Sequence, residues 1–333
     1  MSALSARLSE SAFIADLTPR EKSFWRFLAT VVAGAVSGVI IGLAVGAVAV
    51  ILMGAAIGVF GGGFGTIQHR VTEMMSANGA SMTGAVVLLV LATATNCPMA
   101  ATFLGIAALI AGRRIMSYIT LAPRFRWRMT LLGIALSCLV IGPVVAVGQL
   151  TDPHAQPPPI LSLATTTPER ILYALTALLL IPAAAAEEVV FRGWLLRQSA
   201  ALSKNPVFLM AVNGVLFSAV HGEFAPDPFL TRALMGAGFV YMTLRLRGVE
   251  FSIGAHAANN LLIVLFIQPL TLTPSPSTGI TAPSLFQDLF LFVSYVLMAE
   301  LVARWTPLRR WSGADLVAAP PAPAASAAAA QPP

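Results

Sequence analysis

The sequence predicts an all-α, polytopic membrane protein with about eight transmembrane helices and with both termini in the cytoplasm. The first observation behind this prediction is composition: 57% of the 333 residues are hydrophobic and only 10% are charged, whereas soluble domains carry about 25% charged residues. The second observation is a set of eight apolar segments that reach or approach the roughly 20 residues of a membrane span. These segments are residues 27–60, 83–112, 129–150, 171–196, 206–221, 228–246, 251–268 and 285–305.

The third observation is the distribution of positive charge between these segments. With the N-terminus in the cytoplasm, sixteen of the twenty lysines and arginines fall on the cytoplasmic side, as the positive-inside rule requires. The opposite loops keep only Arg70 and Arg170, while Arg192 and Arg232 lie within spans. Topology and contact with anionic lipids therefore explain the net charge of +6. We expect a multi-pass protein of the cell (inner) membrane, with the lipid bilayer and no nucleic acid as a partner.

The N-terminal half is predicted to comprise a cytoplasmic tail, residues 1–26, and a three-span membrane region, residues 27–150. The first span carries glycines at four-residue intervals, which line one face of a helix and let another backbone approach closely. These glycines are Gly34, Gly38, Gly42 and Gly46, followed by Gly54, Gly58 and Gly62. Packing against another helix of the same chain is the favoured interpretation. A pore or an oligomer formed through this span is the alternative.

The polar residues that could carry chemistry lie in the second half of the chain. A proline-rich loop, residues 151–159, separates the first three spans from a predicted core at 160–305. After this core, residues 312–333 are rich in proline and alanine and contain little that could form a core. We expect this C-terminal tail to be disordered.

Three pairs of residues in the core have the same spacing of four, which places each pair on one helix face. The pairs are Glu188 with Arg192, Phe217 with His221, and His256 with Asn260. Ionisable groups inside a membrane are costly and usually mark function. We expect Glu188 to pair with Arg192, which leaves Glu187, turned by about 100°, without a local cation. Glu187 must then bind a proton or interact with another helix.

Counting along the chain places these groups at a common depth. Glu187 and His221 each lie seventeen residues from Lys204, so an antiparallel hairpin that turns at Lys204 would bring them level. Glu187 is also ten residues from Arg197, which we expect to lie in water. At 1.5 Å per residue, this level is about 15 Å below the inner surface. His256 is predicted to reach the same level, which gives a polar pocket inside the membrane that opens toward the cytoplasm.

A glutamate and a histidine around one water molecule can deprotonate it and generate a nucleophile. A second histidine and an asparagine on one helix face can donate hydrogen bonds to an oxyanion. Glu187, His221, His256 and Asn260 therefore provide the parts for hydrolysing an amide. Equally, Glu187, His221 and His256 could hold a zinc ion with one open coordination position, and the spacing does not decide between the two. Taken singly, each motif also fits a buried structural network.

The sequences EEVVFR (187–192), FSAVH (217–221) and HAANN (256–260) resemble, in order and spacing, the motifs EExxxR, FxxxH and HxxxN. These motifs define the CPBP family of intramembrane proteases, also called the Abi or CAAX prenyl protease 2-like family. The resemblance covers roughly residues 170–268. Each motif alone is weak evidence, but the ordered triple in a helical membrane protein is specific.

The resemblance implies an intramembrane endopeptidase. The roles that it implies are water activation by Glu187 with His221, oxyanion stabilisation by His256 and Asn260, a structural pair of Glu188 and Arg192, and packing by Phe217. The family is described both as zinc-dependent and as glutamate-dependent, so a metalloprotease with zinc stays open. We expect a membrane protein or a lipid-associated peptide as the substrate, without assigning a prenyl group. Some bacterial members are linked to bacteriocin immunity or processing.

Two other classes of function compete with the protease. The first is a non-catalytic immunity or scaffold protein of the same fold. The second is a proton-coupled transporter, in which the glycine-rich span moves and Glu187 with Glu188 forms the proton site. A scaffold should tolerate Glu187→Gln, and a transporter should show uptake driven by a pH gradient.

Overall fold

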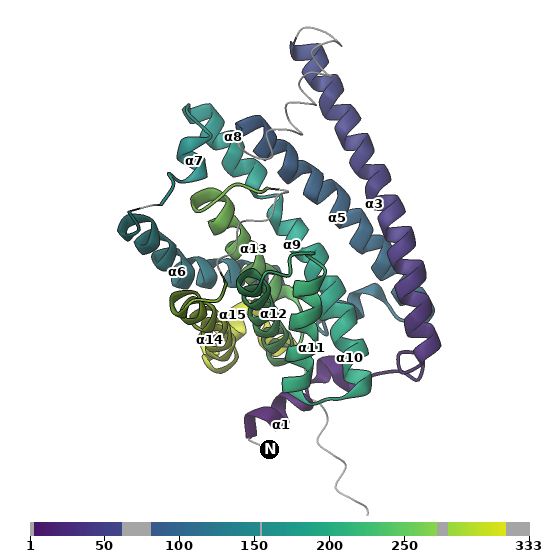
Figure 1. Ribbon diagram of the computed structural model, residues 1–333. Helices are drawn as coiled ribbons and strands as arrows, with labels where there is room; N and C mark the ends of the chain where they lie inside the picture. Colours follow the sequence, from purple (N-terminus) through teal and green to yellow (C-terminus); the bar gives the residue numbers. More distant parts are fainter. Residues whose placement is uncertain (1–2, 62–80, 154, 272–278, 318–333) are drawn as a thin grey trace, which may run out of the picture.

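The computed structural model describes residues 3–61, 81–153, 155–271 and 279–317 (Figure 1). Throughout these ranges every regular element is a helix. The β-type pairing in them is one isolated antiparallel bridge between Thr120 and Gly248. The predicted all-α class is confirmed. In the same ranges, five helices are long and apolar enough to cross a membrane: Phe24–Ala55, Met82–Ala111, Trp127–Thr151, Thr167–Leu202 and Ala282–Arg304.

The elements follow the predicted apolar segments closely. In chain order they are α1 (Ala3–Ser9), α2 (Ala12–Ala15), α3 (Phe24–Gly61), α5 (Met82–Ala111), a 3-10 helix (Ile115–Tyr118), α6 (Trp127–Thr151), α7 (Pro159–Ser162), α8 (Thr167–Ala177), α9 (Leu180–Glu188), a π-helix (Val189–Leu195), α10 (Leu196–Leu202), α11 (Pro206–Ala219), α12 (Pro226–Leu246), α13 (Glu250–Phe266), α14 (Ala282–Arg304), α15 (Thr306–Ser312) and a 3-10 helix (Ala314–Leu316). The segment from α8 to α10 is one apolar stretch of 36 residues. Because α11 and α13 are shorter than a span, the number of eight spans stays a prediction. The cytoplasmic location of both termini also stays a prediction.

Local sequence signals set several helix ends. The side chain of Asn205 caps α11 by accepting a hydrogen bond from the Val207 amide at 2.9 Å, and Pro206 occupies the first turn, where no backbone donor is needed. Thr166 and Glu169 form a reciprocal capping box at the start of α8. These caps fix where α11, which carries the second motif, and the apolar stretch that leads to the first motif begin.

The motif-bearing helices lie between two flanks (Figure 1). The long helices α3 and α5 lie side by side on one flank, and α6 and α14 lie on the other. Between them, α9 packs against α13, and α11 packs against α12. The central hydrophobic cluster includes the fully buried side chains of Phe217 on α11, Phe239 on α12 and Tyr295 on α14. The three motifs thus meet inside the helical bundle.

Two pairs of glycines let the central helices approach to backbone contact. A Cβ atom at Gly133 of α6 would lie 2.5 Å from the carbonyl oxygen of Phe251 on α13, and one at Gly254 would overlap the Thr130 carbonyl of α6. On the other side of the site, a Cβ atom at Gly236 of α12 would lie 3.0 Å from the Cα atom of Gly214 on α11. These close crossings fix the positions of α11 and α13, which carry two of the three motifs.

The glycine-rich face of α3 is occupied within the chain. A Cβ atom at Gly38 would lie 2.9 Å from the Met99 carbonyl of α5, and one at Gly42 would lie 2.8 Å from the Thr95 carbonyl. This agrees with packing against another helix of the same chain. The glycine face from Gly34 to Gly46 is occupied by α5, and an oligomer formed through this span stays a prediction. Gly62 lies outside the described residues.

The predicted N-terminal tail is packed where the structure describes it. Phe13 and Ile14 are fully buried, and the Ser11 hydroxyl donates a 2.6 Å hydrogen bond to the Leu244 carbonyl. Arg197, which we expected to lie in water, is also fully buried. That expectation is wrong because the partner of Arg197 is Glu21, an acidic residue 176 positions earlier in the chain.

The predicted disordered tail, residues 312–333, begins with ordered residues. Ala314–Leu316 form a 3-10 helix, and Arg247 donates a 3.1 Å hydrogen bond to the Val317 carbonyl. The rest of the tail, residues 318–333, lies outside the described residues.

Candidate active site

The first motif lies where an α-helix changes into a π-helix. Glu187 and Glu188 are the last two residues of α9, and Arg192 lies within the π-helix Val189–Leu195. In a π-helix each amide bonds to the carbonyl five residues earlier instead of four, and such segments are rare and frequent at functional sites. The change of helix type alters which face the following residues present.

Glu188 is the centre of a buried ion network. Its Oε1 atom lies 3.0 Å from the Nη1 atom of Arg192 and 3.0 Å from the Nδ1 atom of His256. The side chains of Glu188 and Arg192 are completely buried. The predicted pair of Glu188 with Arg192 is therefore present, and the same carboxylate also fixes the orientation of His256. With Nδ1 donating to Glu188, the other ring nitrogen of His256 faces away from this pair.

That other nitrogen faces Glu187. The Nε2 atom of His256 lies 3.8 Å from the Oε2 atom of Glu187. This oxygen is buried and has no hydrogen-bond partner, although the Glu187 side chain as a whole is 26% exposed. The ring of His256 thus lies between the two adjacent glutamates. The Oε2 atom of Glu188 also has no hydrogen-bond partner, but the Glu188 side chain is completely buried, so Glu187 is the glutamate that a water molecule or a substrate can reach.

His221 lies in the turn between α11 and α12. Its Nδ1 atom lies 2.8 Å from the Phe217 carbonyl one helical turn earlier. When Nδ1 donates to that carbonyl, Nε2 is left as an acceptor. The next residue, Gly222, has φ +70°, a conformation that glycine adopts without strain. His221 is exposed.

Phe217 lies against both histidines. Its ring centroid is 5.0 Å from that of His221 and 5.7 Å from that of His256. On its other side, the Cζ atom of Arg192 lies 4.2 Å from the ring centroid. Phe217 is fully buried, so it fixes the spacing between the first two motifs and supports the Arg192 guanidinium group by a cation–π contact.

Asn260 makes the fewest described contacts with the other predicted site residues. It is half-buried on α13, one turn after His256. The described hydrogen bond at its side chain comes from the Asn259 amide, at 3.5 Å. The amide nitrogen of Asn260 can therefore still donate to a substrate. Its place in an oxyanion site stays a prediction.

One residue of this site, Phe239, could not be predicted from the sequence. The ring of Phe239 on α12 stacks on His256 with a centroid distance of 5.2 Å. It also lies 5.1 Å from the Cζ atom of Arg192. A phenylalanine in an apolar span is indistinguishable from an ordinary core residue by pattern alone, so contact with two motif residues could only be found in three dimensions.

The side chains proposed as zinc ligands do not form a ligand group. Among the residues that the structure describes, no three His, Cys, Asp or Glu side chains are gathered in a way that could hold a metal ion. One of the candidate ligands, His256, is engaged by Glu188 through Nδ1, so only its Nε2 atom is available.

The segment that carries the three motifs is similar to a known protein family. Residues 168–262 match the family model described as type II CAAX prenyl endopeptidase Rce1-like. This match confirms the resemblance that the three motifs predicted, and it contains every motif residue from Glu187 to Asn260.

The chain also resembles one curated protein over about half of its length. The chain is 32% identical over 169 residues to the uncharacterized protein YyaK of Bacillus subtilis (strain 168). That alignment covers 47% of this chain and 54% of YyaK, so the chain spans about half the length of this relative. No solved structure matches the chain.

Proposed function

We propose that the protein is an intramembrane endopeptidase that hydrolyses a peptide bond near the cytoplasmic face of the membrane with a water molecule activated by Glu187 and His221. One observation carries this proposal. Glu187 keeps a buried carboxylate oxygen without a hydrogen-bond partner, and His221 holds its Nδ1 atom on the Phe217 carbonyl. Both groups thereby retain an acceptor for the protons of a water molecule. The Rce1-like match supports the reaction class.

The proposed reaction balances within these side chains. The water gives a proton to Glu187, with His221 as its second hydrogen-bond acceptor, and the hydroxide oxygen forms a bond to the carbonyl carbon of the substrate. The carbonyl oxygen becomes an oxyanion, which accepts hydrogen bonds from the Nδ2 atom of Asn260 and from Nε2 of a doubly protonated His256, whose second proton is taken from solvent before the substrate binds. The carbon–nitrogen bond then breaks, and the proton passes from Glu187 to the leaving amine.

Glu188 and Arg192 act through position in this proposal. Glu188 holds Nδ1 of His256 at 3.0 Å, which turns Nε2 of that ring toward Glu187 and the substrate. Arg192 neutralises Glu188, and the rings of Phe217 and Phe239 enclose the guanidinium group. The low dielectric around such buried groups strengthens their interactions. Neither Glu188 nor Arg192 needs to touch the substrate.

The substrate class follows from the place of the site. Glu187 and His256 lie on helices inside the bundle, next to helices that are long and apolar enough to cross a membrane. A polypeptide that is itself embedded in the membrane, or anchored to it by a lipid, can reach this depth. The experiment is cleavage of fluorogenic peptides, with and without a lipid anchor, by the purified protein in lipid vesicles. We expect cleavage of the anchored peptide, and uptake driven by a pH gradient without cleavage would contradict the proposal.

A zinc-dependent reaction is the alternative mechanism for the same function. In that case Glu187, His221 and His256 would supply the ligands, and zinc would polarise the carbonyl and the water. With the water mechanism, we expect cleavage to continue after the protein is treated with a chelator and the chelate is removed by gel filtration. Loss of cleavage that added zinc restores would replace the water mechanism by the zinc mechanism.

A further inference from the structure

The π-helix that follows the two glutamates is held by the N-terminal half of the chain. Trp194, near the end of the π-helix, stacks on Phe27 of α3 with a centroid distance of 5.7 Å. It also meets Phe103 of α5 edge-on at 4.8 Å. Trp194 is buried. Both aromatic partners lie outside residues 168–262, the segment that matches the family.

The backbone of the π-helix is contacted on a second side by the loop after α5. A Cβ atom at Gly193 would overlap the carbonyl oxygen of Tyr118. Glycine is therefore required at this position for the 3-10 helix Ile115–Tyr118 to approach. Burial raises the pKa of the Tyr118 phenol to about 12, with the Glu21 carboxylate as a further cause.

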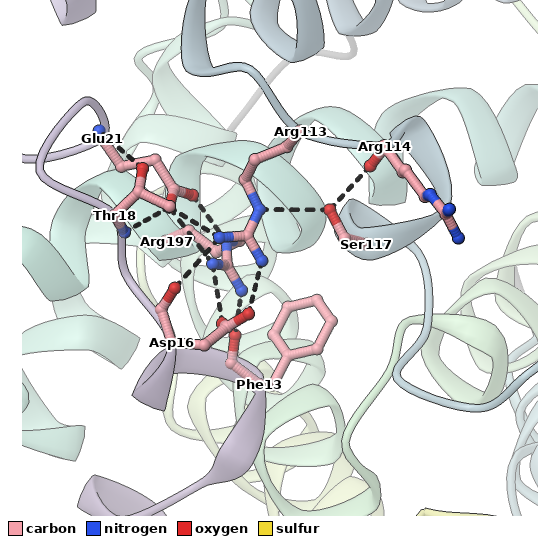
Figure 2. Close-up of polar contacts among 8 residues, drawn as sticks. All are labelled: Phe13, Asp16, Thr18, Glu21, Arg113, Arg114, Ser117 and Arg197. Carbon is pink, nitrogen blue, oxygen red and sulfur yellow. Dashed lines mark hydrogen bonds and ion pairs between the residues drawn. The ribbon is translucent and has the colours of Figure 1, made fainter.

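A third contact is made by Arg197, two residues beyond the π-helix (Figure 2). Its Nε atom donates to Oε1 of Glu21 at 2.9 Å, and its Nη2 atom lies 2.9 Å from Oδ1 of Asp16. Its Nη1 atom donates to the Phe13 carbonyl. The Arg197 side chain is fully buried. All three acceptors belong to the N-terminal segment, residues 13–21.

A second arginine completes this network. Arg113, at the end of α5, donates from Nη1 to Oε2 of Glu21 at 2.9 Å and pairs with Asp16 through Nη2 (Figure 2). Burial alone would raise the pKa of both carboxyl groups, but hydrogen bonds and charge from the two arginines lower the pKa below its ordinary value in each case. Both carboxylates are thus charged at neutral pH and hold two arginines together.

These contacts explain why a π-helix persists here. π-helices are rare and mostly single turns inside α-helices, so a seven-residue π-helix needs tertiary contacts to hold it. Return of Val189–Leu195 to α-helical geometry would leave the Glu188–Arg192 pair on one face but would turn Gly193, Trp194 and Arg197 away from their present partners relative to the two glutamates. The groups that resist this rotation are Trp194, Gly193 and Arg197, and each is held by the N-terminal half.

We propose that the N-terminal clamp, formed by Asp16, Glu21, Phe27, Phe103 and Tyr118, positions Glu187 and Glu188 by fixing the π-helix. Glu21 is its central positioning residue, because it is fully buried and pairs with both arginines. The N-terminal half is then part of the active enzyme, although the family match does not include it. The effect on catalysis rests on the proposed function, whereas the effect on the π-helix does not.

The test compares Glu21→Gln with Glu300→Gln in the purified full chain. Glu300 is a matched control, since it also pairs with two arginines, Arg245 and Arg304, but on α12 and α14. Amide hydrogen exchange is measured by mass spectrometry on peptides that cover residues 186–202. We expect Glu21→Gln to accelerate exchange there by about tenfold or more, because a buried arginine loses its charged partner. Glu300→Gln should leave these peptides unchanged.

Cleavage provides the second measurement. Because the clamp does not touch the substrate, we expect Glu21→Gln to lower kcat by about tenfold or more and to leave KM unchanged. Where Glu21→Gln is poorly folded, Asp16→Asn serves instead, because Asp16 is half-exposed and its loss should produce a smaller change in the same peptides. The clamp would be overturned if peptides 186–202 of Glu21→Gln exchanged at the wild-type rate. It would also be overturned if Glu300→Gln accelerated their exchange as much as Glu21→Gln does. Exchange can be read with or without a cleavable substrate, so this result is separate from the proposed function.

Discussion

Replacement of Glu187 by Gln is expected to lower the rate of peptide cleavage by about a thousandfold or more, since removal of a general base typically costs 10²–10⁴-fold. Gln has nearly the same shape as Glu, but its amide cannot accept the proton of a water molecule. The Oε2 atom of Glu187 has no hydrogen-bond partner, so the substitution breaks no hydrogen bond of that atom. The measurement is initial cleavage rate in lipid vesicles, together with the thermal unfolding midpoint.

Two comparisons make this result specific. Glu300→Gln makes the same chemical change at a mostly buried carboxylate away from the site, and it should retain cleavage. His221→Ala should lose cleavage to a similar extent, because it removes the second acceptor for the water. A Glu187→Gln protein that keeps more than a tenth of the wild-type rate would exclude Glu187 as the base and would favour a scaffold function.

Replacement of Glu188 by Leu is expected to destabilise the protein by about 3–5 kcal/mol. The reason is that Arg192 is completely buried and would lose its carboxylate partner. The measurement is the thermal unfolding midpoint in detergent, with the yield of monodisperse protein as a second readout. An unfolding midpoint within a few degrees of the wild type would show that the buried pair is not a stabilising element.

A double variant separates stability from catalysis at this pair. Combining Glu188→Leu with Arg192→Met removes both charges, and replacement of a buried ion pair by apolar side chains is often neutral or stabilising. We therefore expect the unfolding midpoint to recover. Cleavage should stay low, because His256 has lost the carboxylate that holds its Nδ1 atom. Recovery of cleavage in the double variant would contradict a role for Glu188 in orienting His256.

The helical organisation was largely predictable because apolar length is a strong signal. The segment 83–112 corresponds to α5 (Met82–Ala111), and the predicted break near Lys204 separates α10 from α11. The ion pair of Glu188 with Arg192 was also predictable, since it requires only a spacing of four along one helix. The meeting of the first and third motifs, through His256 at both glutamates, agrees with the common depth obtained by counting residues.

Other parts of the site could not be read from the sequence. The π-helix has no distinct pattern, since its apolar residues fit an α-helix equally well. The burial of Arg197 depends on Glu21, 176 positions away, and no local spacing indicates such a contact. The second partner of Glu188, His256, could not be assigned from the sequence either, because a carboxylate that already has an adjacent arginine gives no reason to expect another hydrogen-bond partner. In each case a tertiary contact overrides the local pattern.

The central claim is that Glu187 makes this protein a protease. The most direct measurement is mass spectrometry of protein C-termini in membranes of cells that produce either the wild-type chain or Glu187→Gln at equal levels. We predict new C-termini on membrane-embedded or lipid-anchored proteins with the wild type, at positions close to the cytoplasmic face, and their absence with the variant. Identical sets of C-termini in both membranes would contradict the account.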